Sequence, residues 1–182
     1  SHIKFSHLIN RANLLPFITH LKTVTGILDV SLLAASVAVI QELKKANHYI
    51  PMVIGCTGWT DSQFEHLKEY SEKACVVYAP NFSPAVTVIK HALNNMGKTL
   101  KTLGYDVAIH ETHHAQKKDS PSGTAKYLAQ PLYESGFDKF DILSSRIGGV
   151  VGVHEITFAS TSDIVKISHE ALSRTIFSRG AL

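Results

Sequence analysis

The chain has 182 residues, with 18 Lys and Arg against 15 Asp and Glu, and a formal net charge of +3 at pH 7. This length can bury a real core in one domain or two small ones, and the cations are dispersed, without the basic runs that nucleic-acid binding needs. No apolar run could span a bilayer, no signal peptide is evident, and two cysteines cannot build a disulfide framework. We therefore expect a cytoplasmic protein without nucleic-acid or membrane partners.

Residues 1–26 are the least readable part of the chain. A dinucleotide-binding domain opens on a strand followed by G-x-G-x-x-G or a close variant. Here Gly26 is the first glycine, so the turn that holds a cofactor's phosphates has no counterpart in the sequence. The pattern allows a truncated chain, omitted flexible segments, or a protein that has lost dinucleotide binding.

Strands and helices alternate from Ile27 onward. The predicted strands cover 27–31, 51–54 and 75–78, and the predicted helices cover 32–46 and a segment from Asp61. Asp61 is the expected cap of that second helix, whose apolar face is expected at Phe64, Leu67, Ser71 and Ala74. This alternation predicts a parallel sheet wound in βαβ units.

Two loops lie at the expected ligand-binding edge of this sheet. Parallel sheets bind ligands beyond the carboxyl ends of their strands. Gly55–Gly58 follows the second predicted strand, and Ala79–Phe82 follows the third. Glycine allows a flat ring to approach the backbone, and Phe82 offers an apolar surface beside it. Tight turns that only pack a core are an equally plausible interpretation of either loop taken alone.

A long helix is predicted over 83–103, after a possible hinge at Ser83-Pro84. Its apolar residues repeat at spacings of three and four, as expected for a core or subunit interface. They are Val86, Ile89, Leu93, Met96, Leu100 and Leu103.

The stretch from Glu111 to Ala125 carries the candidate chemistry. A strand leads into it, since Val107 and Ile109 alternate with polar or small residues. The candidate residues are two proton carriers, a cation and the start of a helix that favours anions: His113, His114, Lys117, Ser122, Gly123 and Thr124. Each alone fits a solvated loop and a capped helix. Together they indicate a site for an anionic substrate that needs a proton.

The rest of the chain predicts a second sheet. A helix over 124–134 is expected to be interrupted by Pro131. Residues 142–146 then lead to Gly148-Gly149, and two strands are expected at 150–159 and 163–169, as a hairpin in a mixed or antiparallel sheet. We also considered the histidines as metal ligands. Adjacent histidines cannot easily face one tetrahedral ion, so no metal site is predicted. The histidines considered are His110, His113, His114, His154 and His169.

The polar stretch resembles the signature of the dihydrodipicolinate reductase family, E-x-H-H-x-x-K-x-D-x-P-S-G-T-A, and fits it at every fixed position. The family's V-I-G-T-T-G and A-x-N-F-S segments correspond to 53–58, with Cys56 in place of threonine, and to 79–83. Its R-x-G-x-x-x-G-x-H segment corresponds to 146–154, where Val153 replaces the glutamate that the family usually has. Its E-I-T-H-x-A-x-S-R segment corresponds to 166–174, where Lys166 replaces the first glutamate.

This resemblance implies an α/β protein with a Rossmann-like dinucleotide-binding domain and an α+β domain with a mixed sheet. The first domain would cover 1–82, without its glycine-rich loop and its N-terminal part, and 175–182 would return to it. The second domain, for substrate binding and oligomerisation, would cover 83–174. The implied reaction is NADH- or NADPH-dependent reduction of 4-hydroxy-tetrahydrodipicolinate, a small anionic cyclic dicarboxylate, in the diaminopimelate route to lysine. A homotetramer is also implied.

The resemblance also implies roles for individual residues. His113 is the expected general acid, and Lys117 is expected to stabilise charge on the ring nitrogen. Substrate contacts are expected from His114, Ser122, Gly123 and Thr124, and cofactor contacts from Gly55, Thr57, Gly58, Ala79, Asn81, Phe82 and Arg174. Another two-domain nicotinamide oxidoreductase, or a non-catalytic ligand-binding relative without the phosphate loop, is the alternative.

Overall fold

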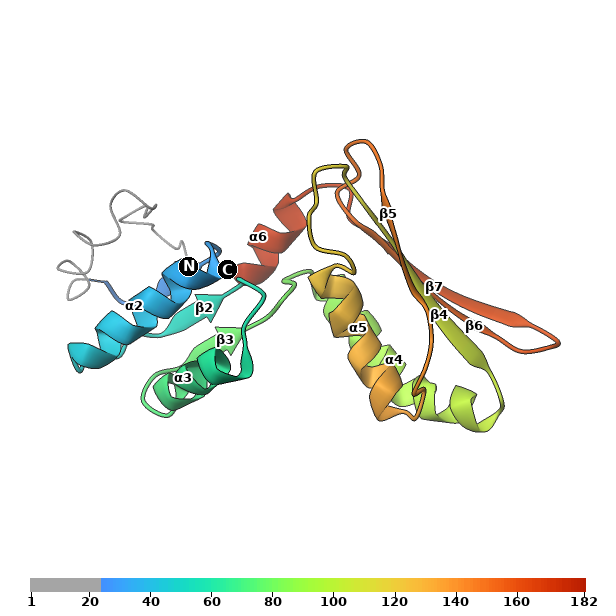
Figure 1. Ribbon diagram of the computed structural model, residues 1–182, viewed down its shortest axis with the longest axis horizontal. Coiled ribbons are helices and arrows are strands. Elements are labelled where there is room, and N and C mark those ends of the chain that lie inside the picture. The colour runs from blue at the N-terminus through green and yellow to red at the C-terminus, as the bar shows by residue number, and fades with distance from the viewer. Residues whose placement is uncertain (1–23) are drawn as a thin grey trace. The chain divides into compact units, whose positions relative to one another are not determined.

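The computed structural model of the protein describes residues 24–182, and the expectation for a missing glycine-rich turn in 1–26 lies largely outside this range. The chain forms two compact units (Figure 1). One ends at Pro80 and also takes in the last two residues, and the other runs from Asn81 to Gly180. The assignment of one unit to a cofactor and the other to a substrate stays a prediction.

The first unit contains a three-stranded parallel sheet, which confirms the βαβ prediction. Its strands are β1 (Ile27–Asp29), β2 (Met52–Ile54) and β3 (Val76–Tyr78), paired in that order. Helix α2 (Leu33–Lys45) connects β1 to β2, and α3 (Asp61–Ser71) connects β2 to β3. The two helices pack against each other. Each turn after β2 and β3 therefore lies at the carboxyl edge of a parallel sheet.

The helix α3 begins and packs differently from the prediction. Thr60, not Asp61, is the N-cap, because its hydroxyl accepts a hydrogen bond from the amide of Gln63 and the Gln63 side chain bonds back to the amide of Thr60. Ser71 is exposed, whereas Tyr70 is fully buried and its hydroxyl bonds the amide and carbonyl of Ile50 at 2.7 and 2.8 Å. A phenol with both hydrogen-bonding roles satisfied can be buried at little cost, so the buried face of α3 includes Tyr70 and not the predicted Ser71.

The second unit contains a four-stranded mixed sheet, as predicted. The strands are β4 (Asp106–His113), β5 (Ile142–Arg146), β6 (Val153–Ala159) and β7 (Ile164–Glu170), in the order β5-β4-β6-β7. Strand β5 is parallel to β4, while β6 is antiparallel to both β4 and β7. The predicted hairpin of β6 and β7 is confirmed. A short helix, α6 (Thr175–Ala181), follows β7.

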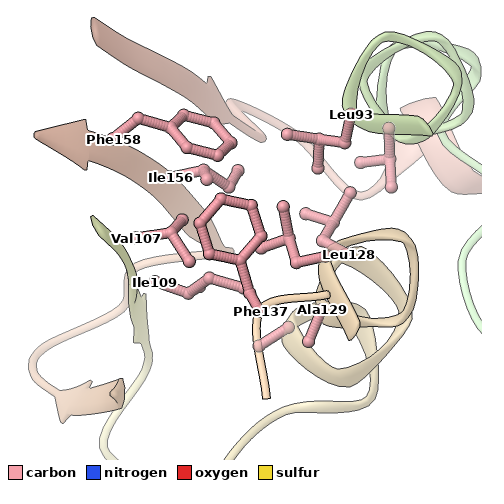
Figure 2. Close-up of a cluster of buried hydrophobic side chains, with 11 residues drawn as sticks. Leu93, Val107, Ile109, Leu128, Ala129, Phe137, Ile156 and Phe158 are labelled. Atoms are coloured by element: carbon pink, nitrogen blue, oxygen red, sulfur yellow. The ribbon is translucent and has the colours of Figure 1, made fainter. Parts of the chain in front are cut away.

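Helices α4 (Pro84–Thr102) and α5 (Gly123–Glu134) pack side by side and supply most of the second core. Figure 2 shows side chains from both helices converging with Val107, Ile109, Ile156 and Phe158 of the sheet. Two details correct the prediction. Leu103 is 66% exposed and lies after the end of α4, so it is not part of the apolar stripe. Helix α5 continues through Pro131, which is buried in its last turn and does not interrupt it.

Over residues 24–182, none of the helices is both long and apolar enough to cross a membrane. Within the same range, no three His, Cys, Asp or Glu side chains gather as a metal ion would require.

Candidate active site

One face of β4 changes from apolar to polar along its length. Side chains two residues apart lie on the same face of a strand, and Val107, Ile109, Glu111 and His113 are all buried. The first two belong to the core beneath α4 and α5. The next two begin a polar site at the carboxyl end of the same strand, so the packed core holds the backbone of the site in place.

Glu111 is the centre of this polar site. Its side chain is 0% exposed, and Arg146 at the end of β5 donates to both carboxylate oxygens, at 3.0 and 2.7 Å. The amide of Ser122 donates to Oε1 at 3.1 Å, and His113 Nδ1 bonds Oε2. Burial alone raises the pKa of this carboxyl, but the hydrogen bonds from Arg146, His113 and Ser122 outweigh burial and lower it to about 2. Glu111 is therefore an anion at any neutral pH.

The His113 imidazole lies beside this carboxylate in a confined space. Burial lowers the pKa of His113, and the neighbouring Glu111 offsets part of that effect. Because Nδ1 bonds Glu111, Nε2 is the ring nitrogen left to face a ligand. A methyl group on Gly152 would lie 3.0 Å from Nε2, so glycine at that position leaves room for the ring. The ring also meets His154 edge to face, with centroids 5.1 Å apart.

Two buried histidines connect the sheet to the starts of both helices. His154 on β6 forms a hydrogen bond of 3.2 Å with the hydroxyl of Ser122, the N-cap of α5. His169 on β7 forms one of 3.3 Å with the hydroxyl of Ser83, the N-cap of α4. In both histidines Nδ1 has no hydrogen-bond partner among the described residues. Burial is the largest cause lowering the pKa of His154 to about 3, and it also lowers the pKa of His169. Both rings are therefore neutral.

The start of α5 is where the sequence predicts an anion site. The Ser122 hydroxyl accepts from the amide of Ala125 at 3.1 Å, and Ser122 is 1% exposed. The amide and the hydroxyl of Ser122 thus both have protein partners, so Ser122 holds the structure of the site. Gly123 donates its amide to Asp119 at 3.3 Å, and Lys117 pairs with the other oxygen of that carboxylate at 2.8 Å. Asp119 therefore occupies the position where Lys117 and the helix start would both favour an anion.

Two pairs of predicted residues contact each other within this unit. Asn81 donates its side-chain amide to Thr124 Oγ1 at 2.8 Å, which joins a predicted cofactor residue to a predicted substrate residue. Arg174 Nη2 lies 3.3 Å from His114 Nε2, which joins another such pair. Phe82 is half-buried. The structure thus brings together most of the residues that the sequence predicted in 81–180.

The remaining predicted cofactor residues lie in the first unit. Gly55 follows β2 and donates its amide to the carbonyl of Asp29 at 2.8 Å, and Ala79 follows β3 and donates to that of Ile54 at 3.1 Å. Thr57 and Gly58 are exposed, and Gly58 has a φ of +90°, which favours glycine. These residues form the exposed carboxyl edge of the parallel sheet.

The sequence prediction missed the supporting residues of the site: Glu111, Arg146, Gly152 and His154. The period-two pattern of β4 carried a usable signal, because extending it past Ile109 places Glu111 and His113 on the buried face. A buried carboxylate needs a donor partner, and pattern alone could not select Arg146, which is separated by 35 positions.

Comparison with known proteins matches the two halves of the chain to one family. Residues 10–82 match the model described as dihydrodipicolinate reductase, N-terminus, and residues 85–182 match dihydrodipicolinate reductase, C-terminus. The chain belongs to the dihydrodipicolinate reductase family. The resemblance inferred from the Glu111–Ala125 signature is thereby confirmed.

Curated relatives of this reductase-family chain carry the name 4-hydroxy-tetrahydrodipicolinate reductase. The protein from Bdellovibrio bacteriovorus is 40% identical over 144 residues, covering 77% of the chain and 61% of the relative. The protein from Thermosipho africanus is 37% identical over 131 residues, covering 72% and 58%. A solved structure of a dipicolinate-bound dihydrodipicolinate reductase from Paenisporosarcina sp. TG-14 aligns with a TM-score of 0.69 and 26% identity, covering 92% of the chain and 69% of that structure.

The chain spans about 60% of the length of these two curated relatives. The fold match supports the predicted combination of a Rossmann-like sheet and a mixed-sheet domain.

Proposed function

We propose that this protein belongs to an NADH- or NADPH-dependent reductase that converts 4-hydroxy-tetrahydrodipicolinate to tetrahydrodipicolinate in the diaminopimelate route to lysine. The observation that carries the proposal is the buried Glu111–His113 pair beside the start of α5, in a chain of this family. The solved relative binds dipicolinate, a planar ring with two carboxylates. A small cyclic dicarboxylate is therefore the substrate class that we propose.

The start of α5 would bind one substrate carboxylate. The first amides of a helix have no intrahelical partner, and the helix dipole favours an anion there. Gly123 and Thr124 supply those amides and one hydroxyl, and Lys117 supplies a positive charge. His114, half-buried beside Arg174, would contact the same ligand. Because Asp119 bridges Gly123 and Lys117, a substrate carboxylate would compete with it for both donors.

His113 would deliver the proton. Reduction adds a hydride to one atom of the ring and requires a proton at its neighbour, which a positioned general acid supplies. His113 Nε2 is the nitrogen left free by Glu111. A dianionic ligand would raise the pKa of the imidazole, which burial lowers in the free protein, and so favour its protonated form. Lys117 would stabilise charge that develops on the ring nitrogen.

In the first unit, a nicotinamide cofactor would be held at the carboxyl edge of the parallel sheet. In the second unit, the family resemblance assigns cofactor contacts to Asn81, Phe82 and Arg174. The exposed part of the turn after β2, Thr57 and Gly58, fits this role. A methyl group added at Gly58 would meet only one atom, 4.0 Å away, so the backbone there is open to a ligand. Trp59, Phe64 and Tyr78 form an aromatic cluster beside that turn. When bound, the cofactor supplies the hydride.

The first test follows nicotinamide oxidation with enzymatically generated substrate. We expect His113→Ala to lower kcat by roughly 10²- to 10⁴-fold, the usual contribution of a general acid, with a smaller change in KM. His91→Ala, an exposed change on α4, is the matched control and should leave kcat unchanged. Equal turnover of wild type and His113→Ala would remove His113 from the proposed role.

A second test measures binding of dipicolinate. Thr124→Val keeps the shape of the side chain but removes its hydroxyl, and we expect a 10- to 100-fold weaker Kd, about 1.5–3 kcal/mol for a hydrogen bond to a charged group. Thr161→Val, in the exposed turn between β6 and β7, is the control. Unchanged affinity in Thr124→Val would place the carboxylate site elsewhere.

Cofactor binding can be followed separately from turnover. Trp59 is the only tryptophan of the chain and adjoins the proposed nicotinamide turn, so its fluorescence should fall on titration with NADH or NADPH. Comparison of the two titrations would give the preference. A non-catalytic relative would show no cofactor binding at all.

We also expect the homotetramer that the family resemblance implies. On the face of the mixed sheet opposite the helices, Leu143 and Ile164 are 56% and 62% exposed, which suits burial against another copy. Sedimentation velocity would measure the oligomeric state directly.

A further inference from the structure

Both oxygens of the buried Glu111 carboxylate take part in hydrogen bonds, two at each oxygen. Oε1 accepts from Arg146 Nη2 and from the amide of Ser122, while Oε2 accepts from Arg146 Nη1 and bonds His113 Nδ1. Arg146 is also fixed, because its guanidinium donates to the carbonyls of Ser145 and Asp119, each at 2.7 Å. One carboxylate therefore connects the imidazole, the end of β5 and the start of α5.

An ionised carboxylate can only accept hydrogen bonds, so the nitrogen that bonds it must carry a proton. We propose that Glu111, oriented by Arg146, is a positioning residue that keeps the proton of neutral His113 on Nδ1 and reserves Nε2 for proton exchange with a ligand. This inference rests on the proposed role of His113 in the reductase. It adds the group that decides which ring nitrogen reacts.

The surroundings of Nε2 support this assignment. Gly152 leaves that edge of the ring uncovered, since a methyl group there would lie only 3.0 Å from Nε2 and 3.3 Å from Cδ2. Main-chain bonds hold the residue itself: the amide of Ile147 donates to the carbonyl of His113 at 2.9 Å. A hydrogen bond at Nδ1 thus fixes the ring, while the lack of a side chain at Gly152 leaves space beside Nε2, so the ring can change its protonation without moving.

Glu111→Gln gives a sharp prediction because glutamine has one oxygen and one amide. The Ser122 amide cannot stop donating, so the glutamine oxygen should take the Oε1 position and keep the bonds from Ser122 and Arg146 Nη2. The glutamine amide then faces both His113 Nδ1 and Arg146 Nη1 as a donor; Nη1 loses this acceptor and keeps its bond to the carbonyl of Ser145. His113 can accept a hydrogen bond from this amide only if its proton moves to Nε2. In the neutral ring, Nε2 can then no longer take up the proton that it would pass to a substrate.

The test is nitrogen NMR of histidine-labelled full chain at about pH 8, above the ordinary histidine pKa, where the neutral tautomers are distinguishable. The His113 signals are identified by their absence in His113→Gln. We expect Nδ1–H in the wild type and Nε2–H in Glu111→Gln. Wild type with the proton on Nε2, or a Glu111→Gln variant that keeps it on Nδ1, would overturn the proposal.

The wild-type measurement decides the issue even if Glu111→Gln does not fold, and it is independent of turnover. A protein with the expected tautomers but no reductase activity would refute the proposed function and leave the positioning role intact. Where turnover is measured, Glu111→Gln should lower kcat by roughly 10²- to 10⁴-fold with little change in the Kd for dipicolinate. Glu134→Gln, an exposed change at the end of α5, is the charge-matched control and should change neither tautomer nor kcat.

Discussion

Acidification should destabilise the protein through His154, well above the pH at which carboxylates titrate. The ring is 3% exposed and lies among His113, Glu111, His169 and Lys117, whose charges also act on it. Its pKa falls from the ordinary 6.5 to about 3, chiefly because burial disfavours the charged form. His154 thus binds a proton near pH 6.5 in the unfolded chain but only near pH 3 in the folded chain. The free energy of unfolding therefore decreases as the pH falls through this window.

The magnitude follows from proton linkage. Between about pH 7 and pH 5 the unfolded state gains most of one proton at His154 and the folded state gains almost none, which lowers the free energy of unfolding by about 1.9 kcal/mol. The result depends little on the folded pKa, provided that it lies below about 4. Glu111 contributes only about 0.2 kcal/mol over the same interval, because its pKa values of 4.5 and about 2 both lie below it.

Urea unfolding of wild type and His154→Gln at the two pH values isolates this effect. Glutamine can retain the bond to Ser122 but cannot titrate, so the pH-dependent loss should be smaller by about 2 kcal/mol in the variant. The shifts of His113 and His169 act in the same direction and remain in both proteins. Exposed His91→Gln is the control and should keep the full loss. If His154→Gln also keeps it, the imidazole is not the source of the acid sensitivity.

Two further predictions concern folding energetics. Leu128→Ala should destabilise the protein by about 2–5 kcal/mol, because Leu128 is fully buried between helix and sheet (Figure 2). Val88→Ala, at a 67% exposed site, is the control and should change the free energy of unfolding little; thermal or urea unfolding measures both. Thr60→Ala should cost about 0.5–2 kcal/mol through loss of the α3 cap, and Asp61→Ala less; an order reversed in urea unfolding would restore Asp61 as the cap.

The elements that the sequence predicted best are those with an unbroken period. The alternation in β4 and β6 and the three-four spacing in α4 each reflect a single buried face, and the structure confirms them. The parallel sheet also followed from the order of its elements. The predictions failed where local chemistry is overridden by packing. Pro131 stays in the last turn of α5, where its ring is buried, and Tyr70 is buried because Ile50 satisfies its hydroxyl.

The candidate site divides in the same way. The residues that we propose to face a ligand lie close together in the sequence, from His113 to Thr124, and a short motif can identify them. Their supports are contributed by other strands: Arg146 by β5, Gly152 by the loop before β6, and His154 by β6. Strand pairing brings these residues to the motif, and His154 lies opposite Glu111 in the register of β4 and β6. No local pattern in a single sequence gives that register, so the residues that support the site can be assigned only once the pairing of the strands is known.

The continuous buried face of β4 has a consequence for how this family can vary. Ile109 and His113 are in phase on one strand, so a single-residue insertion or deletion between them would turn the imidazole to the opposite face of the sheet. A change of two residues preserves the phase, but it would shift Glu111 away from Arg146 if made before Glu111, or His113 away from Glu111 if made after it. The spacing of Ile109, Glu111 and His113 is therefore constrained by the core that the same strand helps to form.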